Sequence, residues 1–275
     1  MTSGENSEVS KTRVLRATLE YDGTRYRGWQ SQVNARTVGG VFAAAVREAI
    51  GEGVRIYGAG RTDAGVHAFA QVASLNLPSA SARGDLQHLQ REINDRLPAD
   101  VHLLALTSAP SNFHARHDAR LRIYRYRVSR RRTAFGKPYV YWVKDRLDAG
   151  AMGEAATLLA GRHDFASFAE NPEGHDSTFV HVDWARVETP AAVPDLILFR
   201  IAASHFLWRM VRRLVGTLLE VGRGRLLPAQ IGELLAVRSP DPAKWTAPPS
   251  GLFLEAVLYD GDPPPPEIDP LRPAF

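Results

Sequence analysis

The order of hydrophobic patterns along the 275 residues repeats once, and this repeat limits the folds that the chain can adopt. In the first half, alternating apolar and polar residues predict strands, and apolar residues three and four positions apart predict helices. Pro98 ends the second of these helices. The expected strands cover residues 14–21, 54–57, 69–75 and 101–106, and the expected helices cover residues 41–50 and 86–97.

The second half repeats this order with insertions. We expect strands at residues 121–128, 181–187, 196–202 and 252–259, and helices at residues 151–159, 206–221 and 231–236. Two copies of one unit predict an α+β fold made of two ferredoxin-like, RRM-like βαββαβ halves, each with an antiparallel sheet covered by helices. We place these halves at residues 1–108 and 109–260, followed by a proline-rich tail, residues 261–275, that we expect to be extended and loosely held.

The chain contains no cysteine, which excludes disulfides, thiolate nucleophiles and cysteine-ligated metal sites. The first residues carry no apolar stretch resembling a signal peptide, and no later apolar run is long enough to cross a bilayer. We therefore expect a cytoplasmic protein without a membrane partner.

Positive charge is concentrated in one segment, although the formal net charge is only +4. Eight arginines lie between Arg116 and Arg132, opposed only by Asp118, and Tyr124 and Tyr126 lie among them. Guanidinium groups suit phosphates and aromatic rings suit unstacked bases, so the segment indicates a surface for single-stranded or looped RNA. The alternative is a solvated strand that happens to be rich in arginine.

The segment 58–68 joins two expected strands and surrounds one charged pair with small residues. Its three glycines and three alanines allow a ligand to approach the backbone around Arg61 and Asp63. The segment lacks the Lys-Ser/Thr ending of a P-loop and the third glycine of a dinucleotide fingerprint. We interpret Asp63 as a nucleophile; the alternative is an aspartate that only organises a turn.

The expected helix 206–221 places one arginine on an apolar face. Arg212 is aligned with Trp208, Val215 and Leu219, whereas the more polar side contains Arg209, Arg213, Gly216 and Glu220. An arginine at this place needs an anionic or hydrogen-bonding partner, unless its side chain reaches solvent. An ion pair with Asp63 would keep that carboxylate charged.

Several motifs together resemble the tRNA pseudouridine synthase A family over nearly the whole chain. They are Glu20-Tyr21-Asp22-Gly23, Gly28-Trp29-Gln30, Gly60-Arg61-Thr62-Asp63-Ala64-Gly65-Val66-His67, Phe113-His114-Ala115-Arg116, Tyr124-Arg125-Tyr126, Asp164-Phe165-Ala166-Ser167-Phe168, Met210-Val211-Arg212 with Val215-Gly216, and Gly251-Leu252. The resemblance implies that two ferredoxin-like halves meet around a central catalytic cleft in a homodimer. It also implies isomerisation of uridine to pseudouridine at positions 38 to 40 of the tRNA anticodon arm, without a cofactor or metal.

The resemblance assigns roles by position. Asp63 matches the catalytic aspartate, and Arg212 matches the arginine paired with it. Arg61 matches a residue that helps to open the RNA helix and takes the place of the flipped base. Tyr124 matches the tyrosine that stacks on the target uracil, and Leu252 matches an apolar residue that packs on this base.

We expect further RNA contacts from His114, Arg116 and Arg122. The chain departs from the family at Gly39, where glutamine is usual and where glycine is expected to loosen the first helix, and at Trp208. Two other functions are compatible with parts of the pattern. A non-catalytic RRM-like protein would leave the aspartate loop without a purpose, and a nucleosidase-like hydrolase would need a second carboxylate.

Overall fold

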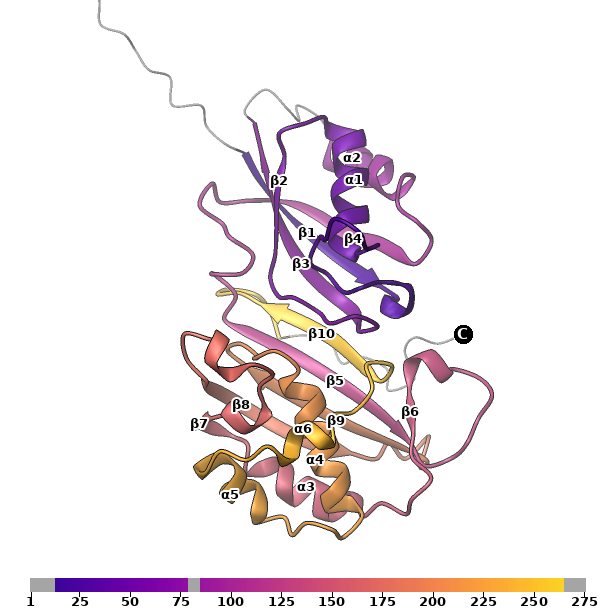
Figure 1. Cartoon of the computed structure of the whole chain (residues 1–275). Helices are drawn as coiled ribbons and strands as arrows, with labels where there is room; N and C mark the ends of the chain where they lie inside the picture. Colours follow the sequence, from indigo (N-terminus) through magenta and orange to yellow (C-terminus); the bar gives the residue numbers. More distant parts are fainter. Residues whose placement is uncertain (1–12, 79–84, 265–275) are drawn as a thin grey trace, which may run out of the picture.

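The computed structural model describes residues 13–78 and 85–264 (Figure 1). Its strands are β1 (Arg13–Tyr21), β2 (Arg55–Gly58), β3 (His67–Leu77), β4 (Val101–Ala109), β5 (Leu121–Ser129), β6 (Tyr141–Trp142), β7 (Gly161–Asp164), β8 (Phe179–Glu188), β9 (Leu196–Ala203) and β10 (Leu252–Leu258). Its α-helices are α1 (Val38–Ile50), α2 (Leu86–Asn94), α3 (Ala149–Thr157), α4 (Met210–Gly222), α5 (Gln230–Ala236) and α6 (Asp241–Lys244). Short 3-10 helices cover Gly23–Arg25, Lys137–Tyr139, Ala166–Phe168 and Pro172–Gly174.

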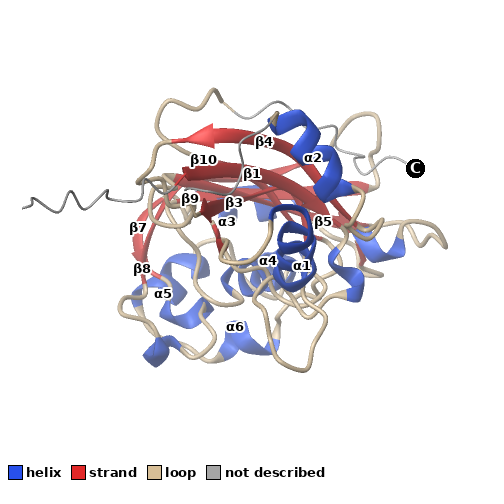
Figure 2. Ribbon diagram, turned by 90° about the horizontal axis from the view of Figure 1, so that it is seen from above, coloured by secondary structure: helices blue, strands red, loops and turns tan. Residues whose placement is uncertain are grey.

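The fold is α+β, and the described strands form one large, mostly antiparallel sheet rather than the two separate sheets expected from the sequence. The strand order is β4-β1-β3-β10-β5-β9-β8-β7, with β2 beside β3 and β6 beside β5. The sheet is continuous because β10 pairs in parallel with β3, where Phe253 lies opposite His67 and Leu254 lies opposite Ala68. Figure 2 shows the strands as a curved layer with most of the helices on one side.

Every expected helix and strand is present, with shifted ends. The helix α1 begins at Val38, earlier than predicted, because the Thr37 side chain accepts a hydrogen bond from the Gly40 amide. The helix α4 begins at Met210 instead of residue 206, because Arg209 adopts a left-handed φ of 60°. The elements β6, β7 and α6 were not predicted from the sequence, because they are too short to show a hydrophobic period.

The side of α4 that was expected to be polar is buried. A Cβ atom at Gly216 would lie 1.6 Å from the carbonyl oxygen of Trp245, so the chain after α6 packs directly on this face. Arg213 and Glu220 are each less than a tenth exposed. Both carry partners that offset their burial, since Arg213 pairs with Glu170 and Glu220 pairs with two arginines that follow the helix.

The arginine-rich strand β5 is also mostly buried, which corrects the expectation that its whole length faces RNA and equally the alternative of a solvated strand. It lies between β10 and β9, so both of its edges are paired, and its side chains from Arg122 to Val128 are buried. Arg125 is 2% exposed and its Nε lies 2.9 Å from Oε2 of Glu255, a fully buried carboxylate that also binds Arg200. The exposed arginines lie at the two ends of the segment, at Arg116, Arg120, Arg130, Arg131 and Arg132.

The beginning of the tail is held in place, contrary to expectation. Asp262 accepts hydrogen bonds of 2.8 and 2.7 Å from the guanidinium of Arg16, which also lies 4.5 Å from the ring centre of Tyr259. Residues 265–275, where the rest of the predicted tail falls, lie outside the described residues. Within the described ranges, no helix has the length and apolar character required to span a membrane.

Candidate active site

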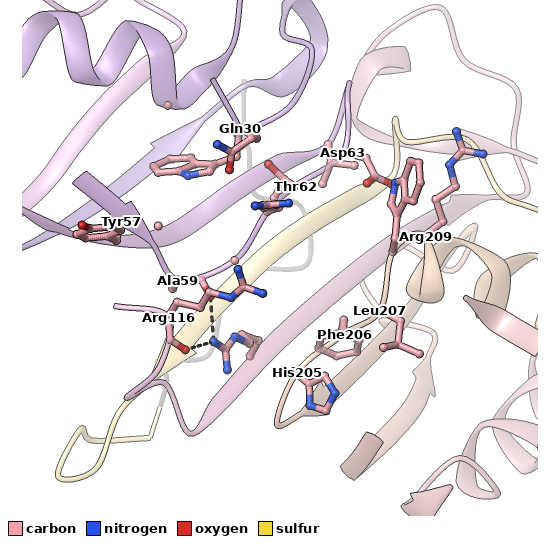
Figure 3. A pocket seen from close by; sticks show the side chains of 18 of the residues that line it. Gln30, Tyr57, Ala59, Thr62, Asp63, Arg116, His205, Phe206, Leu207 and Arg209 are labelled. Carbon is pink, nitrogen blue, oxygen red and sulfur yellow. Dashed lines mark hydrogen bonds between the residues drawn. The ribbon is translucent and has the colours of Figure 1, made fainter. Parts of the chain in front are cut away.

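One cavity, with a volume of about 1460 Å³, is lined by all the residues predicted for the site. Figure 3 shows part of this lining, with Asp63 and Arg116 among the labelled residues. Its walls come from the loop between β2 and β3, from β5 and β10, and from the segment 205–212 that leads into α4. The predicted residues on its surface are Arg61, Asp63, His114, Arg116, Arg122, Tyr124, Arg212 and Leu252.

The loop that carries Asp63 is fixed by close packing on the segment 22–30. A Cβ atom at Gly23 would lie 1.9 Å from the carbonyl oxygen of Val66, and one at Gly28, whose φ is +90°, would lie 2.5 Å from that of Thr62. The Trp29 amide donates a 3.1 Å hydrogen bond to the same Thr62 oxygen. These approaches require glycine at positions 23 and 28, so two glycines outside the loop help to position the aspartate.

Asp63 forms the ion pair with Arg212 that the sequence analysis expected. Oδ2 of Asp63 lies 3.2 Å from Nη1 of Arg212, and the side chains are 22% and 14% exposed. Nε of Arg212 donates a 2.8 Å hydrogen bond to the carbonyl of Ala247, which fixes the orientation of the guanidinium. Within the described residues nothing donates to Oδ1, so this oxygen is available to a molecule in the cavity.

Tyr124 lies in the cavity wall, 8% exposed, with its ring edge-on to Phe206 at a centroid distance of 4.9 Å. Burial raises the pKa of its phenol, and the nearby Tyr21 and Asp63 raise it further. The hydroxyl therefore remains protonated at neutral pH. Leu252, 5% exposed, follows the loop after α6 and adds apolar surface to the same wall.

Tyr21 supports the loop that carries Asp63 through a contact with Thr62, and no role was predicted for it from the sequence. Its hydroxyl lies 2.8 Å from Oγ1 of Thr62, in a buried contact one residue before Asp63. Burial raises the pKa of Tyr21 as well. The sequence does contain a clue to this role. Tyr21 falls on the inward-facing side of the alternating strand 14–21, and a phenol buried there needs a polar partner.

The rim of the cavity carries basic and aromatic groups. Arg61 is exposed, and in the part of the chain that the structure describes no group accepts a hydrogen bond from it. The His114 ring is tilted by 34° against the Tyr57 ring at a centroid distance of 4.8 Å, and its Nδ1 accepts a hydrogen bond from the Arg116 amide. Burial lowers the pKa of His114, and the neighbouring His117 lowers it further.

No three His, Asp or Glu side chains among residues 13–78 and 85–264 are grouped to hold a metal ion.

Arg122 contacts the protein itself, which differs from its expected role as an RNA contact. Its guanidinium donates to the carbonyls of Ala59 and Arg116, as the dashed lines in Figure 3 show, and also to those of Ala119 and Ser204. The side chain is 8% exposed. Arg122 thus joins the aspartate loop to the strands of the second half.

The two departures from the family pattern have different surroundings. Gly39 is buried, and a Cβ atom there would lie 2.5 Å from the carbonyl oxygen of Trp29. Because glycine has no side chain, the first turn of α1 can pack directly on the segment that holds the aspartate loop. The structure thus gives Gly39 a packing role in place of the expected loosening of the helix. Trp208 is 50% exposed and lines the cavity.

Comparison with known proteins identifies the family of this chain. The family model described as tRNA pseudouridine synthase matches residues 17–118 and 155–260. The chain is 41% identical to tRNA pseudouridine synthase A of Moorella thermoacetica over 89% of this chain and 99% of the relative. It is 36% identical to the enzyme of that name from Thermotoga neapolitana over 90% and 100% of the two chains, and 37% identical to that from Geobacillus kaustophilus over 91% and 96%. The chain therefore belongs to the tRNA pseudouridine synthase A family and is an isomerase.

Proposed function

We propose that this chain converts uridine to pseudouridine at positions 38 to 40 of the tRNA anticodon arm, with Asp63 as the nucleophile and without a cofactor or metal. The observation that carries the proposal is the ion pair between Asp63 and Arg212 in a cavity that also contains Tyr124. The names of the relatives, tRNA pseudouridine synthase A, supply the substrate class.

The target base must leave the RNA stack before it reaches Asp63, which costs a few kcal/mol. Stacking on the ring of Tyr124 returns about 1–3 kcal/mol, and Leu252 covers the base with apolar surface. The exposed cation of Arg61 lies on the same surface of the cavity, where it takes the place of the base in the RNA helix or binds a phosphate.

Uridine and pseudouridine contain the same atoms, so the reaction only changes which atom of the base is bonded to the ribose. The bond between C1′ of the ribose and N1 of uracil breaks, and its electron pair stays on N1. Oδ1 of Asp63 either attacks C1′ or removes the C2′ proton to give a glycal, and the chemistry of the site is compatible with both. The base then rotates and C5 forms the new bond to C1′, while the bond from C1′ to Oδ1 breaks in the first route or C2′ regains its proton from Asp63 in the second. The proton on C5 is lost and N1 gains one, which leaves Asp63 as it began.

The remaining expectations belong to the same proposal. We place the protein in the cytoplasm, where it acts as a homodimer. Each chain is divided into two ferredoxin-like halves at residues 1–108 and 109–260. The resemblance of the motifs supports this organisation, as does the repeated order of strands and helices along the chain.

Replacement of Asp63 by asparagine tests the proposal. We expect Asp63→Asn to bind tRNA within about threefold of the wild type, because phosphate contacts dominate affinity. We expect tritium release from tRNA labelled at C5 of uridine to fall by roughly 10⁴-fold or more. Asp183→Asn, which alters an exposed carboxylate on β8 outside the cavity, is the matched control. Full turnover by Asp63→Asn would refute the nucleophile assignment.

Product analysis separates the proposal from its two rivals. Asp176 also lines the cavity, so a hydrolase with two carboxylates would release free uracil from the tRNA. A non-catalytic RNA-binding protein would bind tRNA and release no tritium. Only the proposed reaction leaves pseudouridine in an intact chain, and mapping of the modified positions tests the assignment to the anticodon arm.

A further inference from the structure

A tryptophan at the mouth of the active-site cavity has no role in the reaction described above. Trp208 is 50% exposed and lines the cavity, four residues before Arg212. Tryptophan combines a large apolar ring with a polar N–H group and is enriched at places where a protein meets a partner. The neighbouring Phe206, labelled in Figure 3, packs edge-on to Tyr124, so aromatic side chains extend from the cavity wall towards this mouth.

The backbone around Trp208 is held in an unfavourable conformation. Arg209 and Asn171, with φ values of 60° and 48°, are the non-glycine residues with positive φ in the described part of the chain. The Glu170 amide donates a 2.8 Å hydrogen bond to the Trp208 carbonyl. Asn171 directly follows Glu170 in the chain, and Arg209 directly follows Trp208. Asn171 and Arg209 also line the cavity. Backbone strain of this kind gathers at ligand sites, where the surrounding structure maintains it.

A positive charge lies beside the indole. The guanidinium of Arg209 lies 5.4 Å from the ring centre of Trp208, and its Nη1 lies 3.4 Å from Oε1 of Glu170. The Arg209 side chain is 40% exposed. An aromatic face and a partly exposed guanidinium therefore occupy adjacent positions at the mouth of the cavity.

We propose that Trp208 is a stacking platform for the unpaired base next to the target uridine, with Arg209 on the adjoining phosphate. When the target base leaves the helix, its neighbour loses a stacking partner, and an exposed indole replaces that partner for any of the four bases. Tyr124 is only 8% exposed, whereas Trp208 is 50% exposed and therefore offers the larger free aromatic surface for a second base. The inference rests on tRNA as the substrate, and it makes Trp208 a positioning residue rather than a catalytic one.

The test compares Trp208→Leu with Trp208→Phe, using an unmodified tRNA transcript. We expect Trp208→Leu to raise KM and the Kd for tRNA by about tenfold, with kcat within about twofold. Trp208→Phe, which keeps an aromatic face, restores both constants to within about threefold of the wild type. Trp142→Leu is the matched control, because Trp142 is 39% exposed beside Arg132 and lies outside the cavity.

Two further readouts separate stacking from charge. Binding of tRNA should quench part of the tryptophan fluorescence of the wild type, and Trp208→Phe should lack that part. Arg209→Gln should reduce the slope of log Kd against log salt by about one, whereas Trp208→Leu leaves the slope unchanged.

The stacking role is overturned if leucine and phenylalanine at 208 behave alike, or if Trp142→Leu weakens binding as much as Trp208→Leu. Unchanged fluorescence of Trp208 on binding would also overturn it. Binding of tRNA and formation of pseudouridine are measured separately. A wild-type protein that binds tRNA through Trp208 but forms no pseudouridine would refute the proposed function and would leave the stacking role of Trp208 intact.

Discussion

Oδ2 of Asp63 lies 3.2 Å from Nη1 of Arg212, although 149 positions separate the two residues in the chain. Asp63 comes from the loop between β2 and β3, and Arg212 comes from the first turn of α4, so the pair connects two elements that are distant in the sequence. Both side chains are largely shielded from water, which strengthens their attraction relative to a surface pair.

Removal of this guanidinium should damage the chemical step more than binding. We expect Arg212→Met to lower kcat for pseudouridine formation by about 10²- to 10³-fold, with KM within about threefold, because the charge on Asp63 loses its orienting partner. Single-turnover tritium release measures the step. The control is Arg223→Met near the other end of α4, where the arginine pairs with Asp145 outside the cavity. Equal rates for Arg212→Met and the wild type would show that the ion pair is not needed.

A methyl group at Gly23 should displace the catalytic loop. Its Cβ atom would lie 1.9 Å from the carbonyl oxygen of Val66, so the backbone that follows Asp63 must move. We expect Gly23→Ala to lose about 2–4 kcal/mol in the free energy of unfolding and at least about 10² in kcat/KM. Urea denaturation and tritium release measure the two effects. Gly153→Ala in α3, where a Cβ atom meets nothing within 4 Å, should keep full activity, and comparable losses in both variants would contradict the packing argument.

The buried tyrosines should make the protein less stable in alkali. Burial raises the pKa of Tyr21, Tyr124 and Tyr126, whereas tyrosines in the unfolded chain ionise near pH ~10. Below that pH the phenols are neutral in both states and add no pH dependence. As the pH rises above ~10, only the unfolded state loses these protons, so the free energy of unfolding falls by about 1.4 kcal/mol per pH unit for each tyrosine.

Urea denaturation between pH ~8 and ~11 tests this expectation. The double variant Tyr21→Phe, Tyr124→Phe should show a shallower fall than the wild type, since two groups no longer titrate in the unfolded chain. Tyr57→Phe, at a tyrosine that is 37% exposed, is the control and should follow the wild type. Parallel curves for the double variant and the wild type would count against the role of burial.

Local patterns in the sequence were sufficient to predict every long helix and strand, the loop that carries Asp63 and the placement of Arg212 on an apolar helix face. These features depend on residues within a few positions of one another, so the spacing of apolar residues along the sequence is enough to detect them. The two ends of the ion pair were therefore recognisable as groups that each needed a partner.

Only the tertiary structure decided which charged residues are buried. The sequence analysis placed Arg122 and Arg125 on an RNA-facing strand and Arg213 on the polar side of a helix, and all three are covered. Periodicity cannot report that β5 lies inside a sheet, or that a partner such as Glu255, 130 positions from Arg125, will offset the burial of a charge. Burial of an arginine depends on such distant partners, and chain folding alone brings them together.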